Sequence, residues 1–230
     1  ATPHFIYGTI NNNKSVVCEK TRILTEKLQK TGIDIRIYPG SEVFISPEIP
    51  MLLDKDEICT LNHSSYILVE LPMMSIPPYT EEILYQIRLR GKIPIIAHPE
   101  RNQQIASDPN KLYDLIERGA LSQVNAASIR GLFGKAACEA AYTLLRHNMV
   151  HFISSDAHTC RGRSPKMKEA REIIESEFGG ALASCLFERN AYSILNKKPL
   201  AVPDPERVVN KRSYIISFFT NWVEKLQRKA

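Results

Sequence analysis

The sequence predicts an α/β fold built on a mostly parallel sheet that is either open or closed into a barrel. Short apolar runs rich in β-branched residues alternate along the chain with longer stretches of helical periodicity. Such alternation is typical of βαβ units. The longest apolar runs, IPIIA and YILV among them, have the length of buried strands and are far shorter than the roughly 20 residues that cross a bilayer.

The apolar runs are the expected strands, and the amphipathic stretches between them are the expected helices. Strands are predicted over residues 1–6, 33–38, 66–70, 93–97, 121–125 and 150–154. Helices are predicted over residues 15–30, 80–90, 109–118, 134–147 and 164–178. Two of these helices open with Asp108-Pro109 and Ser164-Pro165, where a capping side chain precedes a proline at the first helical position.

The positive charge of the sequence lies at its C-terminal end. The formal net charge is +5, and residues 197–230 hold eight basic and three acidic side chains, so the residues before them are neutral overall. A basic protein would ordinarily suggest a nucleic-acid partner. Because the charge here belongs to an appendage, we expect no nucleic-acid partner.

The cysteines favour a reducing compartment and a mechanism without a cysteine nucleophile. There are five, scattered and without C-x-x-C spacing: Cys18, Cys59, Cys138, Cys160 and Cys185. This pattern suits reduced thiols in a cytoplasm better than a disulfide framework, so we expect a cytoplasmic protein. None of the five has an arginine six positions later, which leaves a covalent phosphocysteine mechanism without support.

Side chains that bind divalent cations coincide with the ends of the predicted strands, where parallel α/β folds bind their ligands. They are His4, Glu42, Glu70, His98, Asp156 and His158. Three histidines and three carboxylates on one rim suit a cluster of two or three divalent cations. Glu70 is the strongest candidate ligand, because it directly follows a buried apolar run and a buried carboxylate requires a compensating cation.

Each of these residues also has a simpler interpretation. A single His or Asp after a strand is most often a cap or a turn former. The coincidence of six such residues with strand ends weakens that interpretation for the set. The other three histidines, His63, His147 and His151, are interpreted as surface or structural side chains.

Arginines beside two of the strand ends suit a phosphate ester. Arg101 follows His98 by three residues, and Arg161 and Arg163 follow the SSDAH segment. Guanidinium groups pair with phosphoryl oxygens through forked donors, while metal ions share the remaining charge. For Arg161 and Arg163 a solvated loop is an equal alternative. The segment RGLFGK is too short for the phosphate-binding loop of nucleotide triphosphatases.

Six motifs occur in an order and at intervals that resemble one family. They are ATPH, PG-x-E, YIL-x-E-x-P, P-x-IAHPERN, FGK and F-x-x-SDAH. From residue 1 to about residue 200 the sequence resembles the bacterial CpsB/YwqE group of protein-tyrosine phosphatases, in the PHP (polymerase and histidinol phosphatase) superfamily of metal-dependent phosphoesterases. The resemblance implies a distorted (β/α)7 TIM-like barrel over residues 1–200 with a trinuclear metal centre. This centre is usually described with manganese, and with iron or magnesium in some members.

The resemblance also implies roles for the candidate ligands of the first two metals. Glu42 would bridge the two ions. Asp156 would bind the first ion, and Glu70 and His98 would bind the second.

The remaining candidates take the third metal and the phosphate. His4 and His158 would hold the third metal, and Arg101 and Arg163 fall where the family places phosphate-binding arginines. The family pattern begins with a strand that bears a His-x-His pair and then an Asp, an element that this sequence does not contain. We therefore expect a phosphatase domain that lacks its first β/α unit, with ATPH at the end of the family's second strand.

The expected activity is hydrolysis of phosphotyrosine without a phosphoenzyme intermediate. The resemblance implies a tyrosine autokinase of a capsule or exopolysaccharide assembly system as substrate and partner. The alternative is a truncated or degenerate module that binds the kinase or the polysaccharide machinery without hydrolysis. We favour a relative of nucleases or histidinol phosphatases less. The sequence is also compatible with a homo-oligomer.

Residues 201–230 are expected to form a basic amphipathic tail. An apolar stripe at helical spacing runs through it, made of Ile215, Phe218, Phe219, Trp222, Val223 and Leu226. Basic residues flank this stripe. The tail is interpreted either as a helix packed on the barrel or, over residues 211–230, as a helix at an anionic membrane surface or a docking helix for the kinase.

Overall fold

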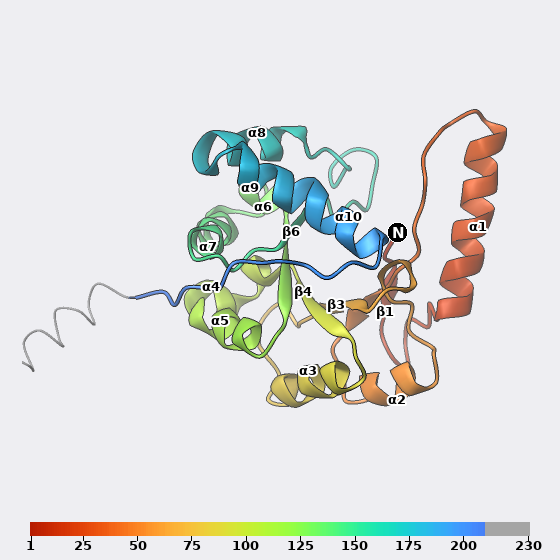
Figure 1. The fold of residues 1–230 in the computed structure, drawn as a ribbon, viewed down its shortest axis with the longest axis horizontal. Helices are drawn as coiled ribbons and strands as arrows, with labels where there is room; N and C mark the ends of the chain where they lie inside the picture. Colours follow the sequence, from red (N-terminus) through yellow and green to blue (C-terminus); the bar gives the residue numbers. More distant parts are fainter. Residues whose placement is uncertain (210–230) are drawn as a thin grey trace, which may run out of the picture.

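Six parallel strands form one sheet, and their order in the sheet follows the sequence. The computed structural model describes residues 1–209, with the strands at the centre and helices around them (Figure 1). The strands are β1 (His4–Phe5), β2 (Glu42–Phe44), β3 (Tyr66–Glu70), β4 (Ile93–Ala97), β5 (Leu121–Asn125) and β6 (Phe152–Ser154). The α/β fold with a mostly parallel sheet is thereby confirmed.

The sheet is open within residues 1–209. Strands β1 and β6 are its two edges, so the closed barrel implied by the resemblance is not seen in this part of the chain. The sequential strand order is nevertheless that of a barrel, in which each βα unit adds the next strand on the same side.

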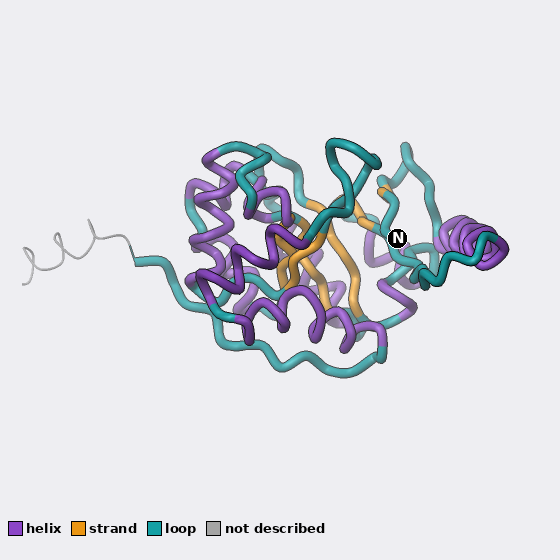
Figure 2. The backbone as a smooth tube through the Cα atoms, turned by 90° about the horizontal axis from the view of Figure 1, so that it is seen from above, coloured by secondary structure: helices purple, strands orange, loops and turns teal. Residues whose placement is uncertain are grey.

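Helices connect the strands and cover the sheet (Figure 2). The α-helices are α1 (Lys14–Lys30), α2 (Ile49–Asp54), α3 (Thr80–Leu89), α4 (Gln103–Ser107), α5 (Asn110–Glu117), α6 (Ala126–Ile129), α7 (Lys135–Arg146), α8 (Lys168–Phe178), α9 (Gly180–Ser184) and α10 (Asn190–Leu195). Two 3-10 turns, η1 (Leu61–His63) and η2 (Pro99–Arg101), and a π-helical turn, η3 (Cys185–Arg189), complete the order. The predicted helices at residues 15–30, 80–90, 109–118 and 134–147 are confirmed to within one residue at each end.

The strand predicted over residues 33–38 is wrong. This segment has no regular secondary structure and no strand partner among the described residues, and Ile33 and Ile35 are exposed. The alternating isoleucines have the pattern of a strand, yet the ladder forms after the Pro39-Gly40 turn, where Glu42 pairs with His4 of β1. Alternation alone does not identify a strand whose apolar side chains find no core.

The helix predicted over residues 164–178 begins later, at Lys168, and Met167 occupies its N-cap position. The backbone N–H groups of His158 and Thr159 both donate to the carbonyl of Arg163, at 2.8 and 3.1 Å. These bonds close a loop over residues 158–163, which delays the start of the helix. The Ser164-Pro165 pair therefore lies in the approach to α8.

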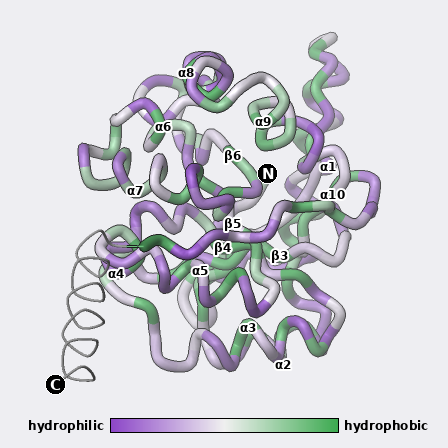
Figure 3. The backbone as a smooth tube through the Cα atoms, turned by 60° about the vertical axis from the view of Figure 1, so that its left-hand side comes forward, coloured by the Kyte–Doolittle hydropathy of each residue, from purple (hydrophilic) through white to green (hydrophobic). Residues whose placement is uncertain are grey.

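The two faces of the sheet have different neighbours, because side chains alternate along each strand. On β3, Ile67 and Val69 belong to a large apolar core, whereas Tyr66 and Leu68 belong to a smaller apolar cluster on the opposite face. The large core includes buried side chains of α2, α3, α5, α7 and α8, and its apolar stretches can be followed in Figure 3. The smaller cluster includes Ile194 of α10. Glu70 is in step with Tyr66 and Leu68, so it lies on the less enclosed side.

Helix α1 lies at the margin of the fold, apart from the helices that cover the sheet (Figures 1 and 2). Val17 is its one buried residue. The side chain of Asn13 caps it by accepting a hydrogen bond from Val16 N at 3.1 Å. At the same end, Lys14 N donates to Glu57 O at 2.7 Å and Lys14 Nζ pairs with Asp56. The helix is thus joined to the body mainly through its first turns.

Residues 201–209 run along the body of the protein. Glu206 N donates to the carbonyl of His147 at 2.8 Å, and Val208 N donates to Asn110 Oδ1 at 2.8 Å. The domain boundary predicted at residue 200 stays a prediction, and the apolar stripe of the tail lies outside the described residues. Within residues 1–209, no helix has the length and apolarity that a membrane span requires.

The core assignment predicts a large loss of stability on truncation at Ile96 of β4, which is fully buried. Ile96→Ala should lower the free energy of unfolding by about 2–5 kcal/mol through lost burial and a residual cavity. Ile35→Ala is a matched control at a 59% exposed site and should change it by less than about 0.5 kcal/mol. Urea denaturation followed by circular dichroism measures both, and equal losses would contradict the assignment.

Candidate metal centre

Two glutamates lie on neighbouring strands at the same face of the sheet. Glu42 is the first residue of β2 and is in register with Leu68 of β3, while Glu70 is the last residue of β3. Because residues two apart on a strand share a face, Glu70 lies diagonally next to Glu42. Their side chains are only 6% and 12% exposed. The expectation that Glu42 follows the end of a strand is corrected here, since Glu42 begins one.

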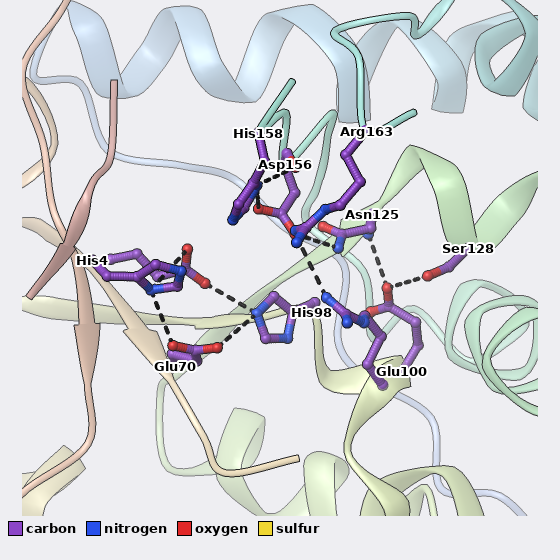
Figure 4. Close-up of polar contacts among 11 residues, drawn as sticks. His4, Glu70, His98, Glu100, Asn125, Ser128, Asp156, His158 and Arg163 are labelled. Carbon is purple, nitrogen blue, oxygen red and sulfur yellow. Dashed lines mark hydrogen bonds and ion pairs between the residues drawn. The ribbon is translucent and has the colours of Figure 1, made fainter. Parts of the chain in front are cut away.

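Two histidines lie against these carboxylates. His4 Nδ1 is 3.3 Å from Glu70 Oε2 and 3.9 Å from Glu42 Oε2. His98 Nε2 is 3.0 Å from Glu42 Oε1 and 3.4 Å from Glu70 Oε1. Each imidazole therefore faces both carboxylates, and Figure 4 shows His4, Glu70 and His98 converging on one point.

His98 reaches this position through an unusual backbone turn. It follows β4 directly and has φ 32° and ψ 54°, in the left-handed region. Residues other than glycine rarely adopt that region. His98 N donates to the carbonyl of Gln123 at 2.7 Å, and Pro99 begins η2 immediately afterwards. The strained residue turns the imidazole back toward the two glutamates.

The carboxylates control the protonation of His98. Burial opposes a charged imidazole, but the hydrogen bonds with Glu42 and Glu70 outweigh it and raise the pKa of His98 to about 9. Burial also opposes the ionised form of Glu70, yet the hydrogen bond from His98 leaves the pKa of Glu70 below its ordinary value. In the protein without metal, a proton on His98 thus compensates the two negative charges.

The opposite wall of the site is formed by residues after β6. Asp156 is again left-handed, with φ 46°, and its Oδ2 accepts a hydrogen bond from Asn125 Nδ2 at 2.8 Å. His158 Nδ1 is 3.6 Å from Asp156 Oδ1. The rings of His158 and His4 lie 5.9 Å apart between centroids, which links the two walls.

The two arginines expected at the phosphate converge on Asp156. Arg163 Nη2 donates to Asp156 Oδ2, and Arg101 Nη1 is 3.7 Å from the same oxygen. The ring of Phe133 lies beside both guanidinium groups, at 4.2 Å from Arg101 Cζ and 5.8 Å from Arg163 Cζ. A guanidinium over an aromatic face is attracted by the ring quadrupole. Arg161 is exposed and has no comparable contact within residues 1–209.

Glu100 and His151 have structural surroundings. The carboxylate of Glu100 is fully buried, and its Oε1 accepts hydrogen bonds from Ser128 Oγ at 2.6 Å and Asn125 N at 3.1 Å. Burial raises the pKa of Glu100 against these bonds. Burial also lowers the pKa of His151 to about 4, and its Nδ1 accepts a hydrogen bond from Ser122 N at 3.0 Å.

Five of the six candidate ligands line one cavity of about 760 Å³: His4, Glu42, His98, Asp156 and His158. His4, Glu42 and Glu70 each present a ligand atom within 4.8 Å of the others. His4 Nδ1 is buried but makes no hydrogen bond with any described residue, although two carboxylates are near it. A nitrogen lone pair that faces carboxylate oxygens suits a shared cation. The residues thus fit a metal centre.

The sequence matches the family described as capsular polysaccharide synthesis, CpsB/CapC, over residues 1–196. The chain belongs to the CpsB/CapC family. Among its relatives, the tyrosine-protein phosphatase YwqE of Bacillus subtilis (strain 168) is 38% identical over 219 residues, which are 95% of this chain and 85% of YwqE. The putative tyrosine-protein phosphatase CapC of Staphylococcus aureus is 36% identical over 169 residues, which are 74% of this chain and 66% of CapC.

Solved structures support the same assignment. The chain aligns with a solved chain from a study described as crystal structures of YwqE from Bacillus subtilis and CpsB from Streptococcus pneumoniae, "unique metal-dependent tyrosine phosphatases". The TM-score is 0.87 at 37% identity, with 91% of this chain and 85% of the solved chain covered. The α/β fold with its parallel six-stranded sheet therefore matches the fold of a solved member of the family.

Two residues of this site did not stand out in the sequence. Asn125 ends β5 and holds Asp156, and Phe133 lies beside both arginines. Asn125 ends a predicted strand, like the candidate ligands, but its amide is not a typical metal ligand. Phe133 belongs to the FGK motif, but the motif alone does not predict which side chains Phe133 contacts.

The raised pKa of His98 predicts a stability that falls with pH when metal is absent. Stability from its proton is complete below the ordinary pKa of 6.5 and is lost as the pH rises through about 9. In EDTA, the free energy of unfolding should fall by on the order of 2–3 kcal/mol between pH 6.5 and pH 9. This loss should be smaller in His98→Gln and unchanged in the distant control His147→Gln. Thermal unfolding at pH 6.5 and 9 measures this, and an identical pH response of all three proteins would contradict it.

Proposed function

We propose that this protein is a metal-dependent protein-tyrosine phosphatase. The observation that carries the proposal is the pair of largely shielded carboxylates, Glu42 and Glu70, each approached by the same two histidines within 3.9 Å. Membership of the CpsB/CapC family and the names of its relatives support the same activity. The reaction is the hydrolysis of a phosphate monoester of tyrosine.

The proposed ligands are those expected from the sequence. Glu42, Glu70 and His98 would hold metal at one wall, Asp156 would hold it at the other, and His4 with His158 would complete the centre between them. Carboxylate and imidazole ligands without a thiolate suit manganese, which we propose as the metal. When bound, such ions lower the pKa of a coordinated water and offset the charge of the phosphate.

Arg101 and Arg163 are proposed to bind the phosphoryl group. In the structure both face Asp156, so a negative group already occupies the position between their donors. A phosphate beside Asp156 would draw the same donors to its oxygens, through paired N–H bonds that strengthen as charge develops there. The cation–π contacts with Phe133 would limit the motion of the two guanidinium groups and keep their donors directed at the cavity.

The cavity also offers an apolar wall to the phenyl ring of the substrate. Ile10, Leu61 and Leu68 line it together with the polar residues. An aromatic leaving group gains from this contact because the wall removes apolar surface from water. We propose phosphotyrosine on a bacterial tyrosine autokinase of capsule or exopolysaccharide synthesis as the substrate, in keeping with the family description.

Closure of the sheet into a barrel is part of the same proposal. We propose that the six strands are part of the distorted (β/α)7 barrel expected from the resemblance. The sequential strand order and the contact between the rings of His4 and His158, from β1 and from the loop after β6, support this arrangement.

The metal assignment predicts that Glu42→Gln and His98→Ala each lower manganese-supported hydrolysis of a phosphotyrosine peptide by more than about 100-fold. Direct ligands should matter more than residues that merely support ligands, whose loss costs about 10–100-fold. Glu172→Gln, at a 60% exposed carboxylate on α8, is the matched control and should leave the rate unchanged. Steady-state assays with added manganese measure this, and full turnover by either ligand variant would refute the assignment.

The phosphate assignment predicts that Arg101→Ala and Arg163→Ala each lower kcat/KM by about 100-fold, the typical cost of one donor to a developing charge. Arg101→Lys should not restore the rate, because an ammonium lacks the forked donors. Arg161→Ala removes an exposed arginine of the same loop and should be neutral. An equal loss in Arg161→Ala and Arg163→Ala would show that only the charge of the loop matters.

A further inference from the structure

A second group of metal-binding side chains lies away from the centre described above. Cys18 of α1, Cys59 in the loop after α2 and His63 of η1 each place one donor atom within 4.8 Å of the other two. Cys18 Sγ and His63 Nε2 are 3.9 Å apart. Two segments of the chain, α1 and the loop over residues 59–63, thus bring two thiols and an imidazole together.

The loop that carries two of these donors is firmly held. Cys59 is fully buried. Asn62 N donates to the carbonyl of Pro39 at 2.7 Å, and Asn62 Nδ2 donates to the carbonyl of Leu195 at 3.2 Å. Asn62 and His63 are both left-handed, with φ of 49° and 54°, a conformation that bulky residues rarely adopt. The fixed loop directs the His63 ring at Cys18.

We propose that Cys18, Cys59 and His63 form a cation site for a thiophilic divalent ion, of which Zn²⁺ is the representative. Thiolates and imidazole select Zn²⁺ over manganese or magnesium. In a tetrahedral zinc site, ligand atoms about 2.0–2.3 Å from the ion lie about 3.6 Å from one another. The 3.9 Å between Cys18 Sγ and His63 Nε2 therefore requires only a small adjustment.

The fourth position of this site is open to water. Cys18 is half-buried and His63 is exposed, so solvent can reach an ion held between them. Three protein ligands and one water form a complete tetrahedral shell. A disulfide between the two cysteines would leave the directed imidazole without a role, which is why the geometry favours a metal.

An ion at this site would join α1 to the wall of the catalytic cavity. Helix α1 has one buried residue, so an added bond at Cys18 would be a substantial part of its attachment. On the other side of the proposed site, Leu61 of η1 lines the cavity. Leu61 also packs closely against Gly40, where an added Cβ would lie 2.8 Å from Leu61 Cδ2. Gly40 belongs to the turn that precedes Glu42.

Cobalt substitution tests the site independently of phosphatase activity. Co²⁺ bound to thiolate has a sulfur-to-metal charge-transfer absorption, whereas Co²⁺ bound to carboxylates and imidazoles at the catalytic centre does not. The chain, kept reduced, is titrated with Co²⁺ alone, and Zn²⁺ is then added as competitor. Cys18→Ser, Cys59→Ser and His63→Ala test the ligands, and Cys138→Ser, a half-buried cysteine elsewhere, is the matched control.

The expected result is a charge-transfer band that reaches a plateau as Co²⁺ is added and disappears on addition of Zn²⁺. Cys18→Ser and Cys59→Ser should each lose or strongly reduce it, His63→Ala should need more Co²⁺ for half-saturation, and Cys138→Ser should match the unaltered protein. Because Cys59 is buried, folding of each variant is checked by circular dichroism, and the half-buried Cys18 gives the decisive variant if Cys59→Ser does not fold. Absence of the band from the reduced protein, or its persistence in Cys18→Ser, overturns the proposal. A Cys18–Cys59 disulfide that forms in air, with no band after reduction, likewise overturns it.

Discussion

The repulsion between two carboxylates on adjacent parallel strands is the constraint on which the site depends. Glu42 and Glu70 are nearly shielded from water and lie on the same face of the sheet. Two such charges in a low-dielectric setting are stable only with compensating positive charge. The proton on His98, directly after β4, meets this need, and the need explains why the chain accepts a strained backbone at His98.

A second layer of contacts positions the charged groups around this pair. Asp156, held by Asn125, faces Arg101 and Arg163, and Phe133 packs beside both guanidinium groups. Each guanidinium is therefore restrained by a carboxylate on one side and by an aromatic ring on the other. Such restraint reduces the ordering cost when an anion binds. Charge that is already arranged around a cavity is what electrostatic catalysis requires.

The sequence predicted the parallel sheet and the candidate residues around the cavity because both depend on local signals. Buried parallel strands are continuous apolar runs, and polar residues at their ends stand out. The segment at residues 33–38 was mispredicted, since its alternating isoleucines have the pattern of a strand but find no strand partner in the described part of the chain. The delayed start of α8 depends on backbone bonds to the carbonyl of Arg163, which no local pattern records. The meeting of Cys18, Cys59 and His63 likewise depends on tertiary packing.

Strand length is distributed unequally across the sheet. The edge strands β1 and β6 have two and three residues, whereas β3, β4 and β5 at the interior have five each. An edge strand offers its unpaired N–H and C=O groups to any extended chain that approaches, and short edges offer few of them. The apolar segments most prone to self-association, YILVE and IPIIA, have partners on both sides. Within residues 1–209, the longest apolar strands therefore present no free edge to another molecule.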